Sequence, residues 1–464
     1  MKRLTYLFVF ILLTGIAYAQ KAKYVFFFIG DGMGVNQVNA TEMYLADKEE
    51  GRIGTRQLLF GSFPAAGIAT SFSASNSITD SAAGGTALAT GSKTYNGAIG
   101  VDTDKQALRS VAYRAQASGK KVGIATSVSV DHATPAALYA HQPNRGNYYE
   151  IACELPQSGF DFFAGAGFLK PSTTADKQEA TPVYEVIEEG GYAIARGLDE
   201  YEEKAEEADK LVLIQEEGQA ADCLPYALDR DEDDLTLKQI TESAVEFLMK
   251  DNKKGFFLMV EGGKIDWACH SNDPATALAE VIDLDQAIGV AYEFYKKHPK
   301  ETLIVVSADH ETGGLGLGTG TYTLNLKALT NQQQSLDALS RQITDLRRQE
   351  TSWEQIKSLL SDRMGFWTKL PLTWEQEKTL RDAYESSFVK HKVEFKETLY
   401  SKTEPLAVAA NEVMSEIAHL GWTSGSHTAE YVPVYAVGAG SELFMGKMDN
   451  TDIPKRIAKA GGYK

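Results

Sequence analysis

The stretch "KYVFFFIG", residues Lys23–Gly30, decides the fold class of this chain. It is a short, continuous run of apolar residues, rich in aromatic and β-branched types, and it ends at a glycine. These properties predict a buried β-strand. A strand that is apolar at every position, rather than at every second one, is typical of a parallel sheet covered on both faces. Asp31 follows directly and is therefore expected at the carboxyl end of that sheet.

Further runs of the same character predict further strands. They are Lys121–Val130, Lys210–Gln215, Gly255–Gly263, Thr302–His310 and Tyr431–Gly440. Amphipathic stretches such as Leu235–Lys250 and Pro274–Tyr295 lie between them and predict helices. The alternation of apolar strands with helices predicts an α/β fold, which we expect to be a three-layer sandwich with a large, mostly parallel central sheet flanked by helices.

The segment from about Thr321 to Leu406 differs in composition from the rest of the chain. It is charged, rich in glutamine and helical in pattern, as in "NQQQSLDALSRQITDLRRQ". Because the last apolar strand lies beyond it, we interpret residues 321–406 as a helical insertion, similar to a crown or cap, in one domain that spans residues 20–464. A separate binding module is the alternative.

The first twenty residues, "MKRLTYLFVFILLTGIAYAQ", have the pattern of a secretory signal peptide. A basic start is followed by an apolar run and by the small residues of a cleavage site at Ala17–Ala19. We expect residues 1–19 to be removed and the mature chain to be exported, either to a periplasm or out of the cell. The apolar run is shorter than the ~20 residues of a membrane span, so no membrane anchor is expected.

The composition indicates a globular protein, with 43% hydrophobic and 23% charged residues. The formal net charge of -17 argues against a nucleic-acid-binding surface, because binding a phosphate backbone needs clustered cations. The three cysteines are Cys153, Cys223 and Cys269. An odd number leaves a free thiol or an intermolecular bridge, and whether Cys153 pairs with Cys223 is left open.

Carboxylates and histidines stand where several predicted strands end, or just before the last one begins. They are Asp31, Glu261, Asp266, His270, Asp309, His310 and His427. In open α/β sheets, ligands bind outside the carboxyl ends of the strands. Each residue alone has an ordinary explanation, such as a turn or a surface pair, but together they predict a paired-metal site. Imidazole and carboxylate ligands suit zinc, and oxygen ligands alone suit magnesium. Cys269, beside His270, is a weaker candidate ligand.

The stretch "ITDSAAGGTALATGSKTYNGAIG", Ile78–Gly100, consists largely of small or hydroxyl-bearing residues and places Asp80 directly before Ser81. A flexible, solvated loop is one interpretation. The other is that Ser81 is a nucleophile at a helix N-terminus, whose small residues let a phosphate approach the backbone N–H groups. Arg145, in "HATPAALYAHQPNR", either binds two phosphate oxygens through its guanidinium or is a surface arginine.

The chain resembles the alkaline phosphatases. The motifs that carry the resemblance are "FFFIGDGMG", "TDSAAGGTALATGSKTYNGAIGVD", "HATPAALYAHQPNR", "VEGGKIDWACH", "SADHETGG" and "SGSHTAEYVPVYAVG", in the order seen in that family. They extend from about Tyr24 to Gly440, and the segment Thr321–Leu406 lies outside them. Each motif alone is a weak signal, but the ordered set is highly specific.

The resemblance implies a role for each matched residue. Ser81 corresponds to the serine that becomes phosphorylated, and Arg145 to the phosphate clamp. Cys269 is not a ligand in the family pattern. The matched ligands are Asp266, His270 and His427 for a first zinc ion, Asp31, Asp309 and His310 for a second, and Asp31, Thr134 and Glu261 for a third ion of the magnesium type.

Two positions vary within the family. His132 stands where some members carry aspartate, and Trp267 stands where some carry lysine. An imidazole beside the third metal makes that site less purely oxygen-lined, so Zn2+ or Co2+ could compete with Mg2+ there. Trp267 removes a cation near the phosphate, although packing alone also explains a tryptophan at this position.

The resemblance implies an exported alkaline phosphatase that converts small phosphate monoesters into an alcohol and inorganic phosphate through a phosphoserine. Family members are often homodimers, and the oligomeric state of this chain is left open. A metal-dependent phosphodiesterase or nucleotide pyrophosphatase is one alternative, and a non-catalytic metal- or phosphate-binding protein is another. A sulfatase is disfavoured, because Ser81 is followed by "AAGG" rather than by the proline and arginine of that motif.

Overall fold

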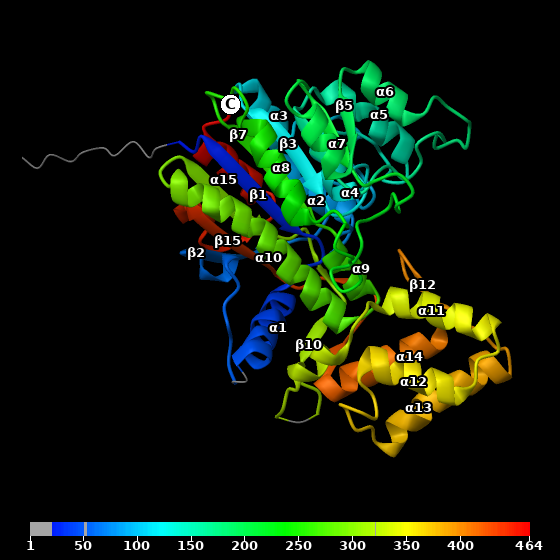
Figure 1. Cartoon of the computed structure of the whole chain (residues 1–464). Helices are drawn as coiled ribbons and strands as arrows, with labels where there is room; N and C mark the ends of the chain where they lie inside the picture. The colour runs from blue at the N-terminus through cyan, green and yellow to red at the C-terminus, as the bar shows by residue number, and fades with distance from the viewer. Residues whose placement is uncertain (1–20, 51–52, 321) are drawn as a thin grey trace, which may run out of the picture.

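The computed structural model describes residues 21–50, 53–320 and 322–464 of the chain (Figure 1). The predicted signal peptide, residues 1–19, lies outside the described residues. One large sheet runs through the centre of the molecule, with helices on both of its faces, and a separate group of helices lies below it in the view of Figure 1.

Within the described residues this sheet has ten strands, and all but one of them run in the same direction. Only β15 is antiparallel to both of its neighbours, β2 and β8. The order across the sheet is β16 (Gly446–Asp449), β2 (Ala65–Thr70), β15 (Val432–Gly438), β8 (Thr302–Ser307), β1 (Tyr24–Gly30), β7 (Phe256–Gly262), β3 (Lys121–Thr126), β4 (Phe162–Ala164), β6 (Leu211–Ile214) and β5 (Ala193–Arg196). The predicted α/β sandwich with a mostly parallel sheet is confirmed.

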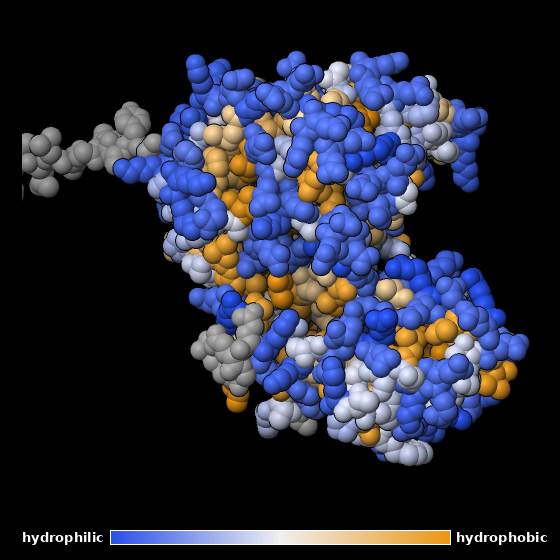
Figure 2. Space-filling model, viewed as in Figure 1, coloured by the Kyte–Doolittle hydropathy of each residue, from blue (hydrophilic) through white to orange (hydrophobic). Residues whose placement is uncertain are grey.

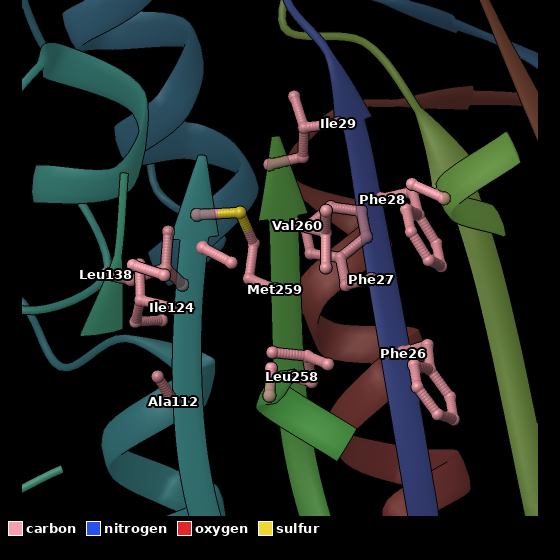
Figure 3. Packing of buried hydrophobic residues seen from close by; sticks show 14 of the residues in the cluster. Phe26, Phe27, Phe28, Ile29, Ala112, Ile124, Leu138, Leu258, Met259 and Val260 are labelled. Carbon is pink, nitrogen blue, oxygen red and sulfur yellow. The ribbon is translucent and has the colours of Figure 1, made fainter. Parts of the chain in front are cut away.

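The strand predicted from "KYVFFFIG" is β1, and it lies near the centre of the sheet between β7 and β8. Every residue of β1 is buried. The Phe26 and Phe28 rings stack on one face, with centroids 6.4 Å apart, while Phe27 points to the other face (Figure 3). Burying each such side chain stabilises the fold by roughly 1.5–3 kcal/mol. The continuous apolar run therefore reflects two covered faces.

Two layers of helices cover the sheet. Helices α8 (Leu237–Met249) and α10 (Pro274–Lys297) lie across the near face in Figure 1, where they contact β1, β3, β7 and β8. Helices α3 (Val111–Ala117) and α15 (Asp452–Gly461) also pack against the central strands and lie behind the sheet in that view.

Four strands of the large sheet were not predicted, namely β2, β4, β5 and β16. Strands β4, β5 and β16 have only three or four residues, too few for a pattern to show, and β5 and β16 are the two edge strands. Strand β2 is mostly alanine and glycine, which have low β-propensity. Two predicted strands also end earlier than expected, at Thr126 and Ser307.

The charged segment after residue 321 folds into helices that share a second hydrophobic cluster, which also includes Ala40, Ala275, Leu278 and Leu315 outside the segment. This cluster joins α11 (Leu336–Arg348), α12 (Trp353–Met364) and α13 (Trp374–Tyr384) to α14 (Pro405–Ala418). A two-stranded hairpin of β11 (Lys396–Glu397) and β12 (Lys402–Thr403) connects α13 with α14. In Figure 1 the β12 hairpin rises from this helical group toward the sheet.

Most of the surface in the view of Figure 2 is hydrophilic, with apolar residues in small groups. Among the described residues, the structure contains no helix that is both long and apolar enough to cross a membrane.

Candidate active site

The predicted carboxylates meet at the carboxyl ends of the three central strands. The parallel register places Ile29 of β1 opposite Glu261 of β7 and opposite Ser307 of β8. The residues that follow these positions therefore lie side by side, so Asp31 and Asp309 enter the same buried region as Glu261. The early end of β8 at Ser307 leaves Asp309 in the loop after the strand.

Helix α2 (Ser81–Thr90) brings the candidate nucleophile to this region. The helix begins at Ser81, and the Asp80 side chain caps it by accepting a hydrogen bond from the Ala83 N–H at 3.0 Å. All residues of α2 are buried. A Cβ atom on Gly84 would lie 3.0 Å from the Asp309 carbonyl oxygen. The small residues therefore let the helix pack against the loop that carries Asp309.

Ser81 faces one of the predicted metal ligands. Its Oγ lies 3.2 Å from Nε2 of His310. His310 Nε2 in turn lies 3.4 Å from an Asp31 carboxylate oxygen and 3.2 Å from Oδ2 of Asp309. Ser81 thus stands beside the group Asp31, Asp309 and His310, which was predicted as one ligand set.

The second predicted set, Asp266, His270 and His427, also comes together. Oδ2 of Asp266 lies 3.4 Å from His270 Nε2, and Oδ1 lies 3.6 Å from His427 Nε2. The two histidine Nε2 atoms face each other at 3.1 Å. The group whose potential ligand atoms all lie within 4.8 Å of one another consists of Asp266, His427 and His310, and it does not include His270. The His310 ring stacks on that of His427, with centroids 3.6 Å apart.

The third group consists of Asp31, Glu261 and His132, whose potential ligand atoms lie within 4.8 Å of one another. Thr134, in the short helix α4 (Ala133–Ala136), donates to Oδ2 of Asp31 at 3.4 Å. The predicted third set of Asp31, Thr134 and Glu261 is therefore assembled, and His132, which was expected beside this metal, lies with it. Asp31 belongs to two groups and would bridge them.

The hydrogen bonding of the histidines fits a cation. His270 Nδ1 lies 2.8 Å from the Gly425 carbonyl oxygen, and His427 Nδ1 lies 2.9 Å from that of Thr79. A carbonyl only accepts, so both Nδ1 atoms carry a hydrogen, and in the neutral form of each ring the Nε2 atom presents a lone pair. Two lone pairs and a carboxylate that face one another at these distances suit a divalent metal ion.

Unpartnered oxygen atoms support the same conclusion. Within the part of the chain that the structure describes, several buried carboxylate oxygens have no hydrogen-bond partner. A buried charged atom without a partner is costly, and a bound cation removes the cost. These atoms are Asp31 Oδ1, Glu261 Oε1, Asp266 Oδ2 and Asp309 Oδ2.

The electrostatics of the site point in the same direction. Burial raises the pKa of Asp31 and of Asp309 well above the usual range, and the neighbouring carboxylates raise each further. Burial likewise raises the pKa of Glu261 to about 7. Burial would also raise the pKa of Asp266, but the nearby His270 and His427 lower it instead. The cluster is therefore an acidic site that a divalent cation would neutralise.

We expect metal removal to destabilise the protein more at pH 8 than at pH 5.5. Without metal, the folded state holds a proton on Glu261 up to about pH 7, whereas the unfolded chain releases it near pH 4.5. Stability of the metal-free protein therefore falls as the pH rises through this window. Scanning calorimetry with and without chelator should show an extra loss in Tm of about 5 °C or more at pH 8. An equal loss at both pH values would contradict the electrostatic account.

Arg145 lies beside the nucleophile helix and is half-buried. Its Nη1 donates to Oδ2 of Asp80 at 3.3 Å, and its Nη2 donates to the Tyr400 hydroxyl at 3.1 Å. Nη2 also lies 3.3 Å from Nε2 of His132. The structure thus links Arg145 to Asp80, the residue that precedes Ser81, rather than leaving it on the open surface.

The two variable positions, His132 and Trp267, lie in one aromatic group at the site. The Trp267 ring stacks on that of Tyr400, with centroids 4.4 Å apart and planes 12° apart. The His132 ring lies 6.1 Å from that of Trp267. Burial, together with the charge of Arg145, lowers the pKa of His132 to about 3, so its imidazole is neutral and able to bind a metal.

Sequence reasoning missed three residues of the site. Thr126 donates to Glu261 and Thr312 donates to Asp266, so both orient predicted ligands. Thr312 comes two residues after the predicted strand Thr302–His310, and this position could have identified it. Thr126 lay inside the predicted strand Lys121–Val130, which in the structure ends at Thr126, so no such signal was present for it. Tyr400 carries no such signal, because it lies in the charged segment between the helices.

The three cysteines are all free. Cys153 and Cys223, whose pairing was left open, do not form a disulfide. Cys269 is buried, and its Sγ accepts from the Gln37 side-chain amide at 3.8 Å. Cys269 belongs to none of the ligand groups found among the described residues, so its candidacy as a metal ligand is not supported.

Comparison with known proteins gives consistent matches. The sequence model of the family "Alkaline phosphatase" matches residues 22–166 and 202–463. Alkaline phosphatase 3 of Bacillus subtilis is 34% identical over 451 residues, which cover 95% of this chain and 89% of that protein.

Solved structures agree with the sequence match. The crystal structure of a cold-active alkaline phosphatase from Shewanella sp. superposes with a TM-score of 0.79 at 30% identity, covering 94% of this chain and 99% of that one. An alkaline phosphatase variant of the Antarctic bacterium TAB5 gives a TM-score of 0.66 at 27% identity, covering 96% and 99%. That variant replaces a histidine by glutamate and has magnesium bound in its M3 site.

Proposed function

Because the chain belongs to the alkaline phosphatase family of metal-dependent phosphomonoesterases, we propose that it hydrolyses phosphate monoesters through a phosphoserine on Ser81. The observation that carries this proposal is the position of Ser81. It begins α2 and lies 3.2 Å from His310, among three groups of potential metal ligands. A nucleophile that stands directly beside such ligands needs no separate general base.

The proposed reaction has two displacements at phosphorus. Ser81 Oγ loses its proton and bonds to phosphorus as the bond between phosphorus and the alcohol oxygen breaks. The alcohol oxygen takes up a proton and leaves, and a phosphoserine remains. Water then attacks the phosphorus atom, the bond between phosphorus and Ser81 Oγ breaks, Ser81 Oγ takes up a proton again, and inorganic phosphate leaves. Arg145 binds phosphate oxygens, and the N–H groups at the start of α2 stabilise the charge that develops on them. Bound divalent ions would lower the pKa of the nucleophile and neutralise the leaving oxygen.

We assign two zinc ions and one magnesium ion to the three groups. The histidine-containing sets, Asp266–His270–His427 and Asp31–Asp309–His310, suit zinc. The set of Asp31, Thr134 and Glu261 is lined by oxygen and suits magnesium. His132 adds a nitrogen to this third group, which favours competition by Zn2+ or Co2+. In the TAB5 alkaline phosphatase, variants with glutamate or aspartate in place of a histidine have magnesium bound in the M3 site.

His132→Asp is therefore expected to shift the third site toward magnesium. The change replaces a neutral imidazole by a carboxylate next to Asp31 and Glu261. After chelation, we expect Mg2+ to restore a larger share of activity in the variant than in the wild type, and Co2+ a smaller share. Trp267→Lys is the companion variant, since it adds a cation without adding a ligand. Identical reactivation profiles in all three proteins would show that neither residue sets metal preference.

Substrate class is tested by comparing a monoester with a diester. We expect p-nitrophenyl phosphate to be hydrolysed at least about 100-fold faster than its bis-ester, because an arginine fork suits a dianionic terminal phosphate. Arg145→Ala should reduce this ratio by weakening monoester hydrolysis selectively. A wild-type preference for the diester would favour a phosphodiesterase, and inactivity with both esters in the presence of zinc and magnesium would favour a binding protein.

We also propose that the protein is exported, on the basis of the pattern in residues 1–19. The mature N-terminus, determined by mass spectrometry of the protein from its native host, should lie near Gln20. A product that retains residues 1–19 would contradict this assignment.

A further inference from the structure

We propose that Tyr400 is a positioning residue, which holds the Arg145 guanidinium in the orientation that binds phosphate. Through Tyr400 the helical segment between β10 (Leu315–Leu317) and α14 would set the affinity of the enzyme for phosphate. This inference rests on the proposed function, because it assumes that Arg145 contacts the phosphate of the substrate and of the product.

The contact between the two residues joins distant parts of the chain. Arg145 follows the short helix α4, and Tyr400 lies in the turn between β11 and β12. The hydroxyl of Tyr400 accepts from Nη2 of Arg145 at 3.1 Å. Asp80 accepts from Nη1 at 3.3 Å, so the two partners hold the two terminal nitrogens of the guanidinium. A planar group that is held at both ends has little freedom to rotate.

The two partners of Arg145 differ in charge. Asp80 forms an ion pair with the guanidinium, with Nη1 and Oδ2 3.3 Å apart. The Tyr400 hydroxyl accepts from Nη2 and is an uncharged group. Tyr400 therefore restrains the guanidinium without adding a second counter-ion that would compete with a phosphate.

Packing against neighbouring rings also restrains the ring of Tyr400. Trp267 of α9 (Lys264–His270) stacks on one face of the ring, with centroids 4.4 Å apart. The rings of His132 and His270 lie 5.8 Å and 5.5 Å from it. Tyr400 is thus packed against one predicted zinc ligand and against a residue of the third metal group.

The hairpin has its own attachments on both sides. Toward the sheet, Lys396 Nζ donates to Asn272 Oδ1 at 3.3 Å, and the Ser401 hydroxyl lies 3.4 Å from that of Ser271. Toward the helical group, Glu404 follows β12, accepts from Arg347 and caps α14. Adjacent side chains of the turn have different environments, because Tyr400 is packed in the site while Leu399 is 63% exposed.

The test measures KM, kcat and the inhibition constant of inorganic phosphate for Tyr400→Phe. This variant keeps the ring and its stacking but removes the Tyr400 hydroxyl as an acceptor for Nη2 of Arg145, which leaves His132 Nε2, at 3.3 Å, as the remaining partner of that nitrogen. We expect KM and the inhibition constant to rise on the order of 10-fold, as for the loss of a hydrogen bond to a charged group. The value of kcat should stay within a few-fold or increase, because phosphate leaves faster. Leu399→Ala, on the same turn, is the matched control and should equal the wild type.

A double-mutant cycle separates positioning from direct contact. In an Arg145→Ala background, Tyr400→Phe should leave the inhibition constant unchanged, because the residue through which it acts is gone. If Tyr400→Phe still raises the inhibition constant in the Arg145→Ala background, Tyr400 contacts phosphate directly. If Tyr400→Phe alone leaves the inhibition constant unchanged, Tyr400 does not contribute to phosphate binding. Either result overturns the proposal. Equal Tm and metal content in the variant and the wild type are required for the comparison.

The proposed function is checked separately in the same assay. Hydrolysis of p-nitrophenyl phosphate by the wild type, and its loss in Ser81→Ala, test the phosphoserine mechanism without involving Tyr400. If the wild type is active and Ser81→Ala is not, the proposed function holds. A wrong prediction for Tyr400→Phe would then contradict only the positioning role of Tyr400.

Discussion

Replacing Ser81 by alanine is expected to reduce monoester hydrolysis by roughly 10⁴-fold or more, with little loss of stability. The change removes the only atom that forms a covalent bond to phosphorus in the proposed first displacement. It leaves the Asp80 cap of α2 and the three metal groups in place. The measurement is kcat/KM for p-nitrophenyl phosphate with zinc and magnesium present, together with Tm and metal content.

A chemical readout makes this prediction specific. Wild-type protein that is mixed with labelled inorganic phosphate and quenched in acid should carry label on Ser81, and the alanine variant should carry none. Ser77→Ala is the matched control, because Ser77 is exposed in the loop just before α2. Full activity in Ser81→Ala, or label on a different residue, would show that the nucleophile lies elsewhere.

Replacing Asp31 by asparagine is expected to lower activity by about 10³-fold or more and to release bound metal. Asp31 belongs both to the group with Asp309 and His310 and to the group with His132 and Glu261. One neutral amide therefore weakens two sites at once. Activity and metal content, measured by elemental analysis after dialysis, should fall together, and Asp104→Asn on the exposed surface should leave both unchanged.

Stability distinguishes this effect from misfolding. Asp31 is fully buried, and the neighbouring carboxylates raise its pKa. Removing its charge relieves that repulsion, so the metal-free variant should have a higher Tm at pH 8 than the metal-free wild type. A variant that is inactive, low in metal and also less stable without metal would show instead that Asp31 is needed for the fold.

The central part of the fold could be predicted because its signal is local. Val25–Ile29 of β1, Phe256–Val260 of β7 and Leu303–Val306 of β8 are continuous apolar runs. Such a run is typical of a strand that is covered on both faces, whatever its neighbours are. Short strands such as β4, and strands of small residues such as β2, lack such a signal. They are extended because they pair with longer neighbours, β4 with β3 and β2 with β15.

The carboxylates of the candidate site were predictable for a related reason. Because parallel strands end at one edge of the sheet, a residue after β1 and a residue after β8 meet, although they are far apart in sequence. The ligand groups confirm that these side chains come together, while their metals and roles remain proposals. The orientation of each ligand was not predictable, since it depends on Thr126 and Thr312, which reach it from other elements.

The sequence by itself determined the features that depend on neighbours along the chain. The strand character of β1 is one, and the start of α2 at Ser81 is another, because its cap comes from Asp80, one residue away. Only the tertiary structure decided which side chains meet over long separations. The contact of Arg145 with Tyr400 spans 255 positions and that of Ser81 with His310 spans 229. The physical reason is that a cap or an apolar run is stabilised within its own segment, whereas such contacts exist only after separate elements have packed.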